Sequence, residues 1–114
     1  MTYVQGMVAA VPTANKQAFC DHASQMLELF KKHGALSVVE NWGHDVPDGE
    51  VTSFPMAVKC KPDETVVFSW ISWSDKATCD AAWEAMMPEM EKMGDMPFDG
   101  KRMIFGSFDT VLEG

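Results

Sequence analysis

Residues 65–73 read Thr-Val-Val-Phe-Ser-Trp-Ile-Ser-Trp and form the clearest predicted strand in this chain. Such β-branched and aromatic side chains are enriched in strands because they fit a pleated, half-buried surface. Successive side chains of a strand point to opposite faces, so Phe68 and Trp70 share one face while Ile71 and Trp73 share the other. The strand therefore carries bulky apolar groups on both faces.

The segments on either side of this strand alternate between strand and helix periodicity. Apolar residues recur at helical spacing over residues 14–33 and 76–87, and at strand spacing over 2–11, 35–43 and 102–112. The resulting order, β-α-β-β-α-β, is typical of an α+β, ferredoxin-like fold. We therefore expect a single domain over residues 1–114, with a four-stranded antiparallel sheet and both helices on one face.

The apolar character of both sheet faces predicts a second layer of protein. Two helices cover one face only, and the other face of an antiparallel sheet is ordinarily polar. Here Phe68 and Trp70 lie on one face of their strand and Ile71 and Trp73 on the other. In the strand at residues 35–43, Leu36 and Trp42 lie on one face and Val39 on the other. A large exposed apolar face marks an interface. We expect a C2 homodimer packed sheet to sheet.

Local signals set the expected ends of the elements. Four residues are candidate helix N-caps: Thr13 or Asn15 for the first helix, and Ser74 or Asp75 for the second. Pro88 is expected to end or kink the second helix, or to begin a further helical turn. Residues 54–61 are ambiguous and are interpreted as a short extended segment.

Charge and cysteine content restrict the class of partner and the compartment. The net charge is −8 and the pI is about 4.6, which opposes binding to nucleic acid or to an anionic membrane. Cys20, Cys60 and Cys79 cannot all pair within one chain, and the N-terminus lacks the pattern of a secretory leader. We expect reduced thiols and a cytoplasmic location.

A first cluster of polar residues follows the predicted strand at residues 35–43. It contains Trp42, His44, Asp45 and Asp48. A histidine can act as a general base near neutral pH when a carboxylate orients it, and Asp48 reaches His44 more easily than Asp45 does. The alternative is a polar loop in which Asp48 serves the turn Pro-Asp-Gly.

A second polar cluster precedes the last predicted strand and contains Asp99, Lys101 and Arg102. Arg102 could bind a ligand carboxylate through two parallel hydrogen bonds. It could equally form a structural ion pair with Glu40 or Asp45 on a neighbouring strand. The first of these alternatives would make it a catalytic or binding residue.

Methionine is abundant, with ten residues in the chain and five of them between positions 86 and 96. A stripe that contains Trp83 and Met86 could line an adaptable apolar pocket between the second helix and the sheet, although ordinary core packing is the alternative. No metal-binding, nucleotide-binding or nucleophile-elbow motif is present. We therefore expect no metal and no cofactor.

The order of elements and several motifs together resemble the YbaA-like family, which consists of small bacterial proteins of unknown function. The similar stretches are Tyr3-Val4, Val11-Pro12, Phe30-Lys31, Gly34-Ala35-Leu36, Val39-Glu40, residues 45–49, residues 64–71 and residues 96–103. The resemblance implies a dimeric α+β barrel, in agreement with the expected homodimer. It implies no particular activity, because fold does not determine function.

Two functions are considered. The first is a homodimer that binds a small apolar or aromatic molecule, without any catalytic apparatus. The second is a metal-free enzyme of monooxygenase or isomerase type, with His44 as base. The candidate catalytic residues are His44, Asp48 and Arg102, and the candidate ligand-binding residues are Trp42, Trp70, Trp83, Met86, Asp99 and Lys101.

Overall fold

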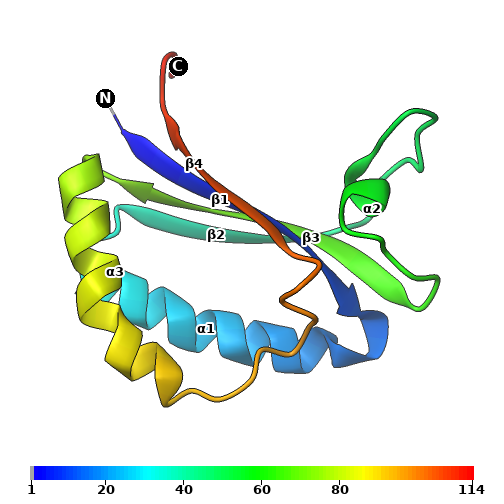
Figure 1. Ribbon diagram of the computed structural model, residues 1–114, viewed down its shortest axis with the longest axis horizontal. Coiled ribbons are helices and arrows are strands. Elements are labelled where there is room, and N and C mark those ends of the chain that lie inside the picture. The colour runs from blue at the N-terminus through cyan, green and yellow to red at the C-terminus, as the bar shows by residue number, and fades with distance from the viewer. Residues whose placement is uncertain (1) are drawn as a thin grey trace.

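The computed structural model describes residues 2–114 and contains four strands and three α-helices (Figure 1). A short 3-10 turn, Thr13–Asn15, leads into the first helix. The elements in chain order are β1 (Tyr3–Pro12), α1 (Lys16–Lys32), β2 (Ser37–Trp42), α2 (Phe54–Ala57), β3 (Glu64–Trp73), α3 (Lys76–Glu91) and β4 (Ile104–Asp109). No helix within residues 2–114 is long and apolar enough to cross a membrane.

The four strands form one antiparallel sheet in the order β2-β3-β1-β4. The two central strands pair along their whole length, from Tyr3 opposite Trp73 to Pro12 opposite Glu64. The two long helices, α1 and α3, both lie on one side of the sheet (Figure 1). The predicted ferredoxin-like fold is therefore confirmed, including the placement of both main helices on one face.

The helix-covered face holds most of the buried core. Ala9, Val11, Val67 and Trp73 point to this face and are fully buried, as the alternation of a strand requires. Phe30 of α1 meets the edge of the Trp73 ring, with ring centroids 6.2 Å apart. Burial of one such large apolar side chain contributes about 1.5–3 kcal/mol to folding, so this layer accounts for much of the stability.

The opposite face is covered at one end only. There Val58, which follows α2, packs on Val8, Ala10 and Val66. Along the rest of this face large apolar side chains remain accessible to solvent: Phe68 is 41% exposed, Ile104 45% and Phe108 61%. The predicted apolar, uncovered sheet face is present.

Residues 54–61 differ from the expected extended segment, because Phe54–Ala57 forms a single helical turn. The Ser53 hydroxyl accepts a hydrogen bond from the Met56 amide at 3.1 Å, and Pro55 occupies an early helical position. Proline is preorganised for the first turn of a helix. The Ser53 cap and Pro55 therefore favour a helical turn, although apolar residues at helical spacing do not extend along residues 54–61.

The helix caps follow the sequence in part. Asp75 caps α3, since its carboxylate accepts a hydrogen bond from the Thr78 amide at 2.7 Å, and the helix continues through Pro88 to Glu91. Asn15 occupies the N-cap position of α1 without a side-chain bond. Thr13 does not cap either, because its hydroxyl pairs with the Thr65 hydroxyl at 2.7 Å.

The edge strands are shorter than predicted. β4 begins at Ile104 rather than Arg102, because the Arg102 amide closes a turn on the Asp99 carbonyl at 3.3 Å. It ends at Asp109, which pairs with Tyr3 at the beginning of β1. Beyond Asp109 the Thr110 amide still donates to the Thr2 carbonyl at 3.0 Å, so the pairing reaches the first residue that the structure describes.

Candidate ligand-binding site

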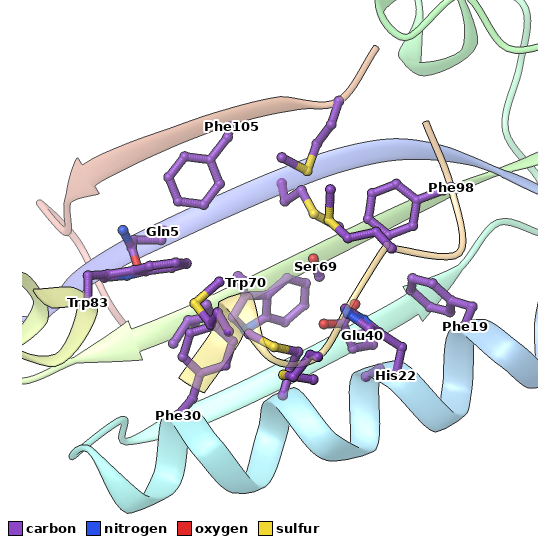
Figure 2. A pocket seen from close by; sticks show the side chains of 18 of the residues that line it. Gln5, Phe19, His22, Phe30, Glu40, Ser69, Trp70, Trp83, Phe98 and Phe105 are labelled. Carbon is purple, nitrogen blue, oxygen red and sulfur yellow. The ribbon is translucent and has the colours of Figure 1, made fainter. Parts of the chain in front are cut away.

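A cavity of about 400 Å³ lies between the helices and the sheet (Figure 2). Its lining is mainly aromatic and aliphatic, and six methionines contribute to it. The residues that line it are Gln5, Met7, Phe19, His22, Ala23, Met26, Phe30, Glu40, Ser69, Trp70, Ile71, Trp83, Met90, Met93, Gly94, Met96, Phe98, Met103 and Phe105. Its size and composition are typical of small-molecule sites, which are concave, apolar and provided with few polar groups.

The segment between α3 and β4, residues 92–103, forms one wall of the cavity. Phe98 in this segment packs against Phe19 of α1, with ring centroids 6.2 Å apart. The Asn15 amide group also donates a hydrogen bond to the Pro97 carbonyl at 3.5 Å. The wall is thus attached to the start of α1, while Met93, Met96 and other flexible side chains complete the lining.

Gln5 organises the polar part of the floor. This residue is only 6% exposed, and its Oε1 accepts hydrogen bonds from Nε1 of Trp73 at 3.1 Å and from Nε1 of Trp83 at 2.6 Å. Trp83 also meets Phe30 and Phe105 edge to face, at 5.4 and 6.1 Å between centroids. The indole ring of Trp83 is therefore fixed in orientation where it borders the cavity.

Glu40 and His22 are the two titratable side chains of the lining, and they enter the cavity from different elements (Figure 2). Glu40 comes from β2, directly opposite Ser69 of β3 in the strand register. Glu40 is exposed to solvent, and partial burial on its cavity side raises the pKa of its carboxyl, a shift that the Ser69 hydroxyl opposes. Burial lowers the pKa of the His22 imidazole. Both shifts favour the uncharged form of the group.

The lining has no fixed positive charge, because none of the cavity residues is lysine or arginine. It offers one carboxyl, one imidazole, one hydroxyl and the Gln5 amide among apolar side chains. Such a set can accept and donate hydrogen bonds to a mostly apolar molecule. Within residues 2–114 no group of histidine, cysteine and acidic side chains has the arrangement of a metal site.

The first predicted cluster lies away from this cavity. His44, Asp45 and Asp48 are exposed, and none of them contributes to the lining. Trp42 is half-buried beside them, where its ring packs on Phe19 at 5.9 Å and lies under the ammonium group of Lys16. Trp42 therefore supports the wall of the cavity from behind without lining it.

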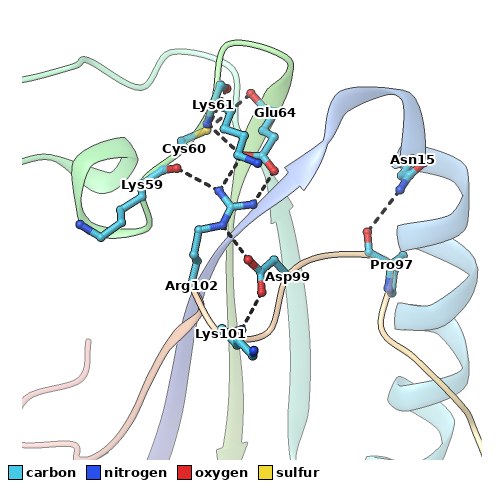
Figure 3. Close-up of polar contacts among 9 residues, drawn as sticks. All are labelled: Asn15, Lys59, Cys60, Lys61, Glu64, Pro97, Asp99, Lys101 and Arg102. Carbon is cyan, nitrogen blue, oxygen red and sulfur yellow. Dashed lines mark hydrogen bonds and ion pairs between the residues drawn. The ribbon is translucent and has the colours of Figure 1, made fainter.

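The second predicted cluster forms a network of ion pairs (Figure 3). The Arg102 guanidinium binds Glu64 through two hydrogen bonds of 2.7 Å, from Nη1 and Nη2. Its Nε donates to Asp99 at 3.0 Å and Nη1 also donates to the Lys59 carbonyl at 2.9 Å. The structural ion pair was anticipated, but its carboxylates are Glu64 and Asp99 rather than Glu40 or Asp45.

This network fixes the geometry of the turn before β4. The Asp99 carboxylate also accepts a hydrogen bond from the Lys101 backbone amide at 2.9 Å, so the Asp99 side chain and the Lys101 backbone hold the turn. The paired guanidinium holds the pKa of the Glu64 carboxyl at about 2. Because the Glu64 side chain is 5% exposed, a ligand carboxylate would have to displace a buried partner to reach Arg102.

The remaining predicted ligand-binding residues divide between cavity and core. Trp83 lines the cavity, and its role in ligand binding stays a prediction. Met86 is fully buried with Cys79 and Ala82 and belongs to the core. Trp70 borders the cavity, but its strand position directs the ring to the opposite face, where it meets Phe68 at 5.5 Å.

Four polar lining residues, Gln5, His22, Glu40 and Ser69, lie outside the predicted site, and the sequence carries a signal for three of them. Glu40 falls on the strand face of Val38 and Trp42, and His22 falls three residues after Phe19 on the apolar stripe of α1. Gln5 likewise interrupts the apolar alternation of β1. A polar residue that falls on the apolar face of its strand or helix is directed toward the core or a cavity. Gln5, His22 and Glu40 all fall on such a face.

The fold and this cavity together define a class: an α+β, ferredoxin-like protein with an apolar pocket between its helices and its sheet. The chain belongs to the family described as "Protein of unknown function (DUF1428)", whose model matches residues 2–100. It is 51% identical over 116 residues to the uncharacterized protein YbaA of Escherichia coli (strain K12), covering 99% of each chain. The resemblance to YbaA-like proteins is thereby confirmed.

Two solved structures share the fold. A dimeric ferredoxin-like protein from an uncultured marine organism aligns with a TM-score of 0.59 and 12% identity, covering 99% of this chain and 98% of the other. A protein of unknown function from Nitrosomonas europaea aligns with a TM-score of 0.50 and 14% identity, covering 100% and 94%. At these identities the likeness concerns the fold alone.

Proposed function

We propose that this protein binds a small apolar, preferably aromatic, molecule in the cavity between α1, α3 and the sheet. The observation that carries the proposal is the cavity itself, about 400 Å³ in volume and lined mainly by aromatic and methionine side chains. Ordinary cores are close-packed, with few voids larger than a water molecule. This space is partly open to solvent, with Glu40, Met96 and Phe105 exposed along it, and an open apolar pocket of this size is typical of a small-molecule site.

The lining also supports the apolar character of the ligand. Trp83, Phe30 and Phe105 form a connected set of edge-to-face rings, which is suited to contact with a further aromatic ring. Methionine side chains adapt to ligands of different shape because they are unbranched and polarizable. Net charge and the absence of a basic stripe disfavour nucleic acid as the ligand.

The proposed functional unit is a cytoplasmic homodimer. The open sheet face presents Phe68, Ile104 and Phe108 to solvent, and a second copy packed on this face would bury them. Cys20, Cys60 and Cys79 are free, which is consistent with a reducing compartment. Native mass spectrometry of the gently purified protein would report the subunit number and any bound molecule together.

A cavity-filling substitution tests the proposed binding. Propylbenzene is the probe, and its affinity is measured by isothermal titration calorimetry together with intrinsic tryptophan fluorescence. Ala23 lines the cavity from α1, so Ala23→Phe should occupy part of the space and weaken binding about tenfold or more. The matched control is Ala18→Phe, which adds the same ring to an exposed position of the same helix.

The expected control results separate this site from the His44 cluster. Ala18→Phe and His44→Ala should each leave the affinity within about threefold, because neither residue lines the cavity. Equal loss in Ala18→Phe and Ala23→Phe would contradict the proposal, as would the absence of any binding by the unmodified protein. A large loss in His44→Ala would move the site to the exposed loop after β2.

A further inference from the structure

The polar groups of the cavity differ in how many further hydrogen bonds each could form with a ligand. Oε1 of Gln5 already accepts two indole N–H groups, so it offers little to a ligand. Glu40 and Ser69 lie opposite each other on β2 and β3, and Ser69 is 5% exposed. A carboxylate can accept about four hydrogen bonds, and Ser69 can supply one. Glu40 is therefore the main acceptor that the lining still offers.

The charges of the cavity discriminate against anions. No lysine or arginine lines it, and Arg102 is occupied by Glu64 and Asp99. A ligand carboxylate would enter an apolar space that contains another carboxyl and no positive partner. Burying an unpaired charge costs far more than burying a neutral polar group, so anionic molecules are rejected.

We propose that the cavity selects uncharged aromatic molecules that carry a hydroxyl group, with Glu40 as the acceptor of the hydroxyl hydrogen bond. This inference rests on the proposed function and specifies the ligand class. The aromatic rings and methionines contact the apolar part of the ligand. The Glu40 carboxylate, on the β2 side of the cavity, accepts the hydrogen bond from the ligand hydroxyl. His22, on the α1 wall, can accept or donate a second bond when neutral.

The environment of Glu40 supports this assignment. Glu40 is exposed on the edge strand β2 while also lining the cavity, so a ligand can reach its carboxylate, and the protein atoms on its cavity side raise its pKa. A ligand hydroxyl placed against it would take the place of a water molecule as donor. Hydrogen bonds to a charged acceptor are stronger than neutral ones, so the hydroxyl should contribute about tenfold or more to affinity.

The test compares three ligands of one shape at pH 7.5: propylbenzene, 4-propylphenol and 4-propylbenzoate. Affinities are measured by calorimetry for the unmodified protein and for Glu40→Leu and Glu40→Gln. The unmodified protein should bind 4-propylphenol about tenfold more tightly than either of the other two. Glu40→Leu should reduce the preference for the phenol over propylbenzene to less than about threefold.

Glu40→Gln addresses charge separately, because it keeps an acceptor oxygen and removes the negative charge. It should bind 4-propylbenzoate more tightly than the unmodified protein does. Unchanged binding of propylbenzene by both variants would show that their cavities are intact. Equal affinity of the unmodified protein for the phenol and propylbenzene would overturn the inference alone. Failure of all three ligands to bind would overturn the proposed function and this inference with it.

Discussion

The Gln5 amide lies where β1, β3 and α3 meet. Its oxygen accepts hydrogen bonds from two indole N–H groups, those of Trp73 and Trp83. Its Nε2 donates to the Ser107 hydroxyl at 3.4 Å, on the neighbouring β4. Through these hydrogen bonds the buried Gln5 side chain connects β1, β3 and β4 to α3, the helix that carries Trp83. It thereby orients the aromatic wall of the cavity.

Replacing this amide should destabilise the fold through the unpaired indoles. Gln5→Met keeps a similar volume but removes the acceptor, so two indole N–H groups lose their partner. A buried unsatisfied donor costs about 1–3 kcal/mol, and we expect a loss of about 2 kcal/mol or more in the free energy of unfolding. Urea denaturation followed by tryptophan fluorescence measures it.

The control for this substitution is Gln25→Met, which changes the same residue type at an exposed position of α1. It should alter the free energy of unfolding by less than about 0.5 kcal/mol. If both variants lose the same stability, the indole hydrogen bonds are not the cause.

At the residue scale, the sequence predicted the apolar character of the cavity better than its polar groups. Trp83 was assigned to a pocket from the helical stripe, and it lines one. Glu40 and His22 were visible only as polar residues at apolar-phase positions. Whether such a residue meets a cavity or open solvent depends on how far α1 and α3 diverge and on where residues 92–103 run, and neither is a local property.

At the scale of elements, the Arg102 network attaches the turn before β4 to the start of β3. The guanidinium reaches Glu64 at the first position of β3, Asp99 in its own turn and the Lys59 carbonyl after α2 (Figure 3). The same turn continues into the wall that carries Phe98 and Met96. The network therefore fixes one end of the cavity wall.

The sequence indicated an ion pair for Arg102 but could not identify Glu64. The two expected partners, Glu40 and Asp45, belong to β2 and to the loop that follows it. In the sheet order β2-β3-β1-β4, however, β2 and β4 are the two opposite edges. Arg102 instead meets Glu64 at the first position of the central strand β3, and this proximity depends on the completed sheet.

This ion pair should make stability depend on pH in a defined window. The pKa of Glu64 is lowered to about 2 by the hydrogen bonds from Arg102, from an ordinary value of 4.5. A carboxyl whose pKa is lower in the folded than in the unfolded state stabilises the folded state fully at pH values above its unfolded-state pKa. This stabilisation is lost as the pH falls through its folded-state pKa. The stabilisation should therefore be complete above pH 4.5 and disappear toward pH 2.

Glu64→Gln isolates this contribution. At pH 6 it should lower the midpoint of thermal unfolding by roughly 5 °C, and the difference from the unmodified protein should shrink between pH 4.5 and pH 2. Circular dichroism melts at a series of pH values measure both. The control, Glu84→Gln, changes an exposed residue of α3 and should stay close to the unmodified protein throughout. A constant difference across the pH series would contradict the role of the charged pair.

At the scale of the whole molecule, the two faces of the sheet have different environments. One face is covered by α1 and α3 and contains the cavity, while the other is covered by the α2 region at one end only (Figure 1). Sequence alternation predicted this asymmetry, because each strand carries bulky side chains on both faces and the chain has two long helices. The partner that would cover the open face lies outside one chain, so the alternation could indicate an interface but not its geometry.

The proposed homodimer depends on this open face, and a single charge should disrupt it. Phe108 on β4 is 61% exposed and has Val4 of β1 as its register partner. Phe108→Glu would place a carboxylate in the proposed interface, where an unpaired buried charge is strongly unfavourable. Size-exclusion chromatography with light scattering should show a dimer for the unmodified protein and a monomer for this variant.

The matched control is Leu27→Glu, which places the same charge at a 40% exposed apolar position of α1, a helix that lies on the other side of the sheet. This variant should remain dimeric. Binding of propylbenzene distinguishes an interface effect from unfolding, because the cavity opens on the helix side and a folded Phe108→Glu monomer should still bind. A monomeric unmodified protein would contradict the sheet-to-sheet dimer, and a monomer for both variants would show that added charge alone separates the subunits.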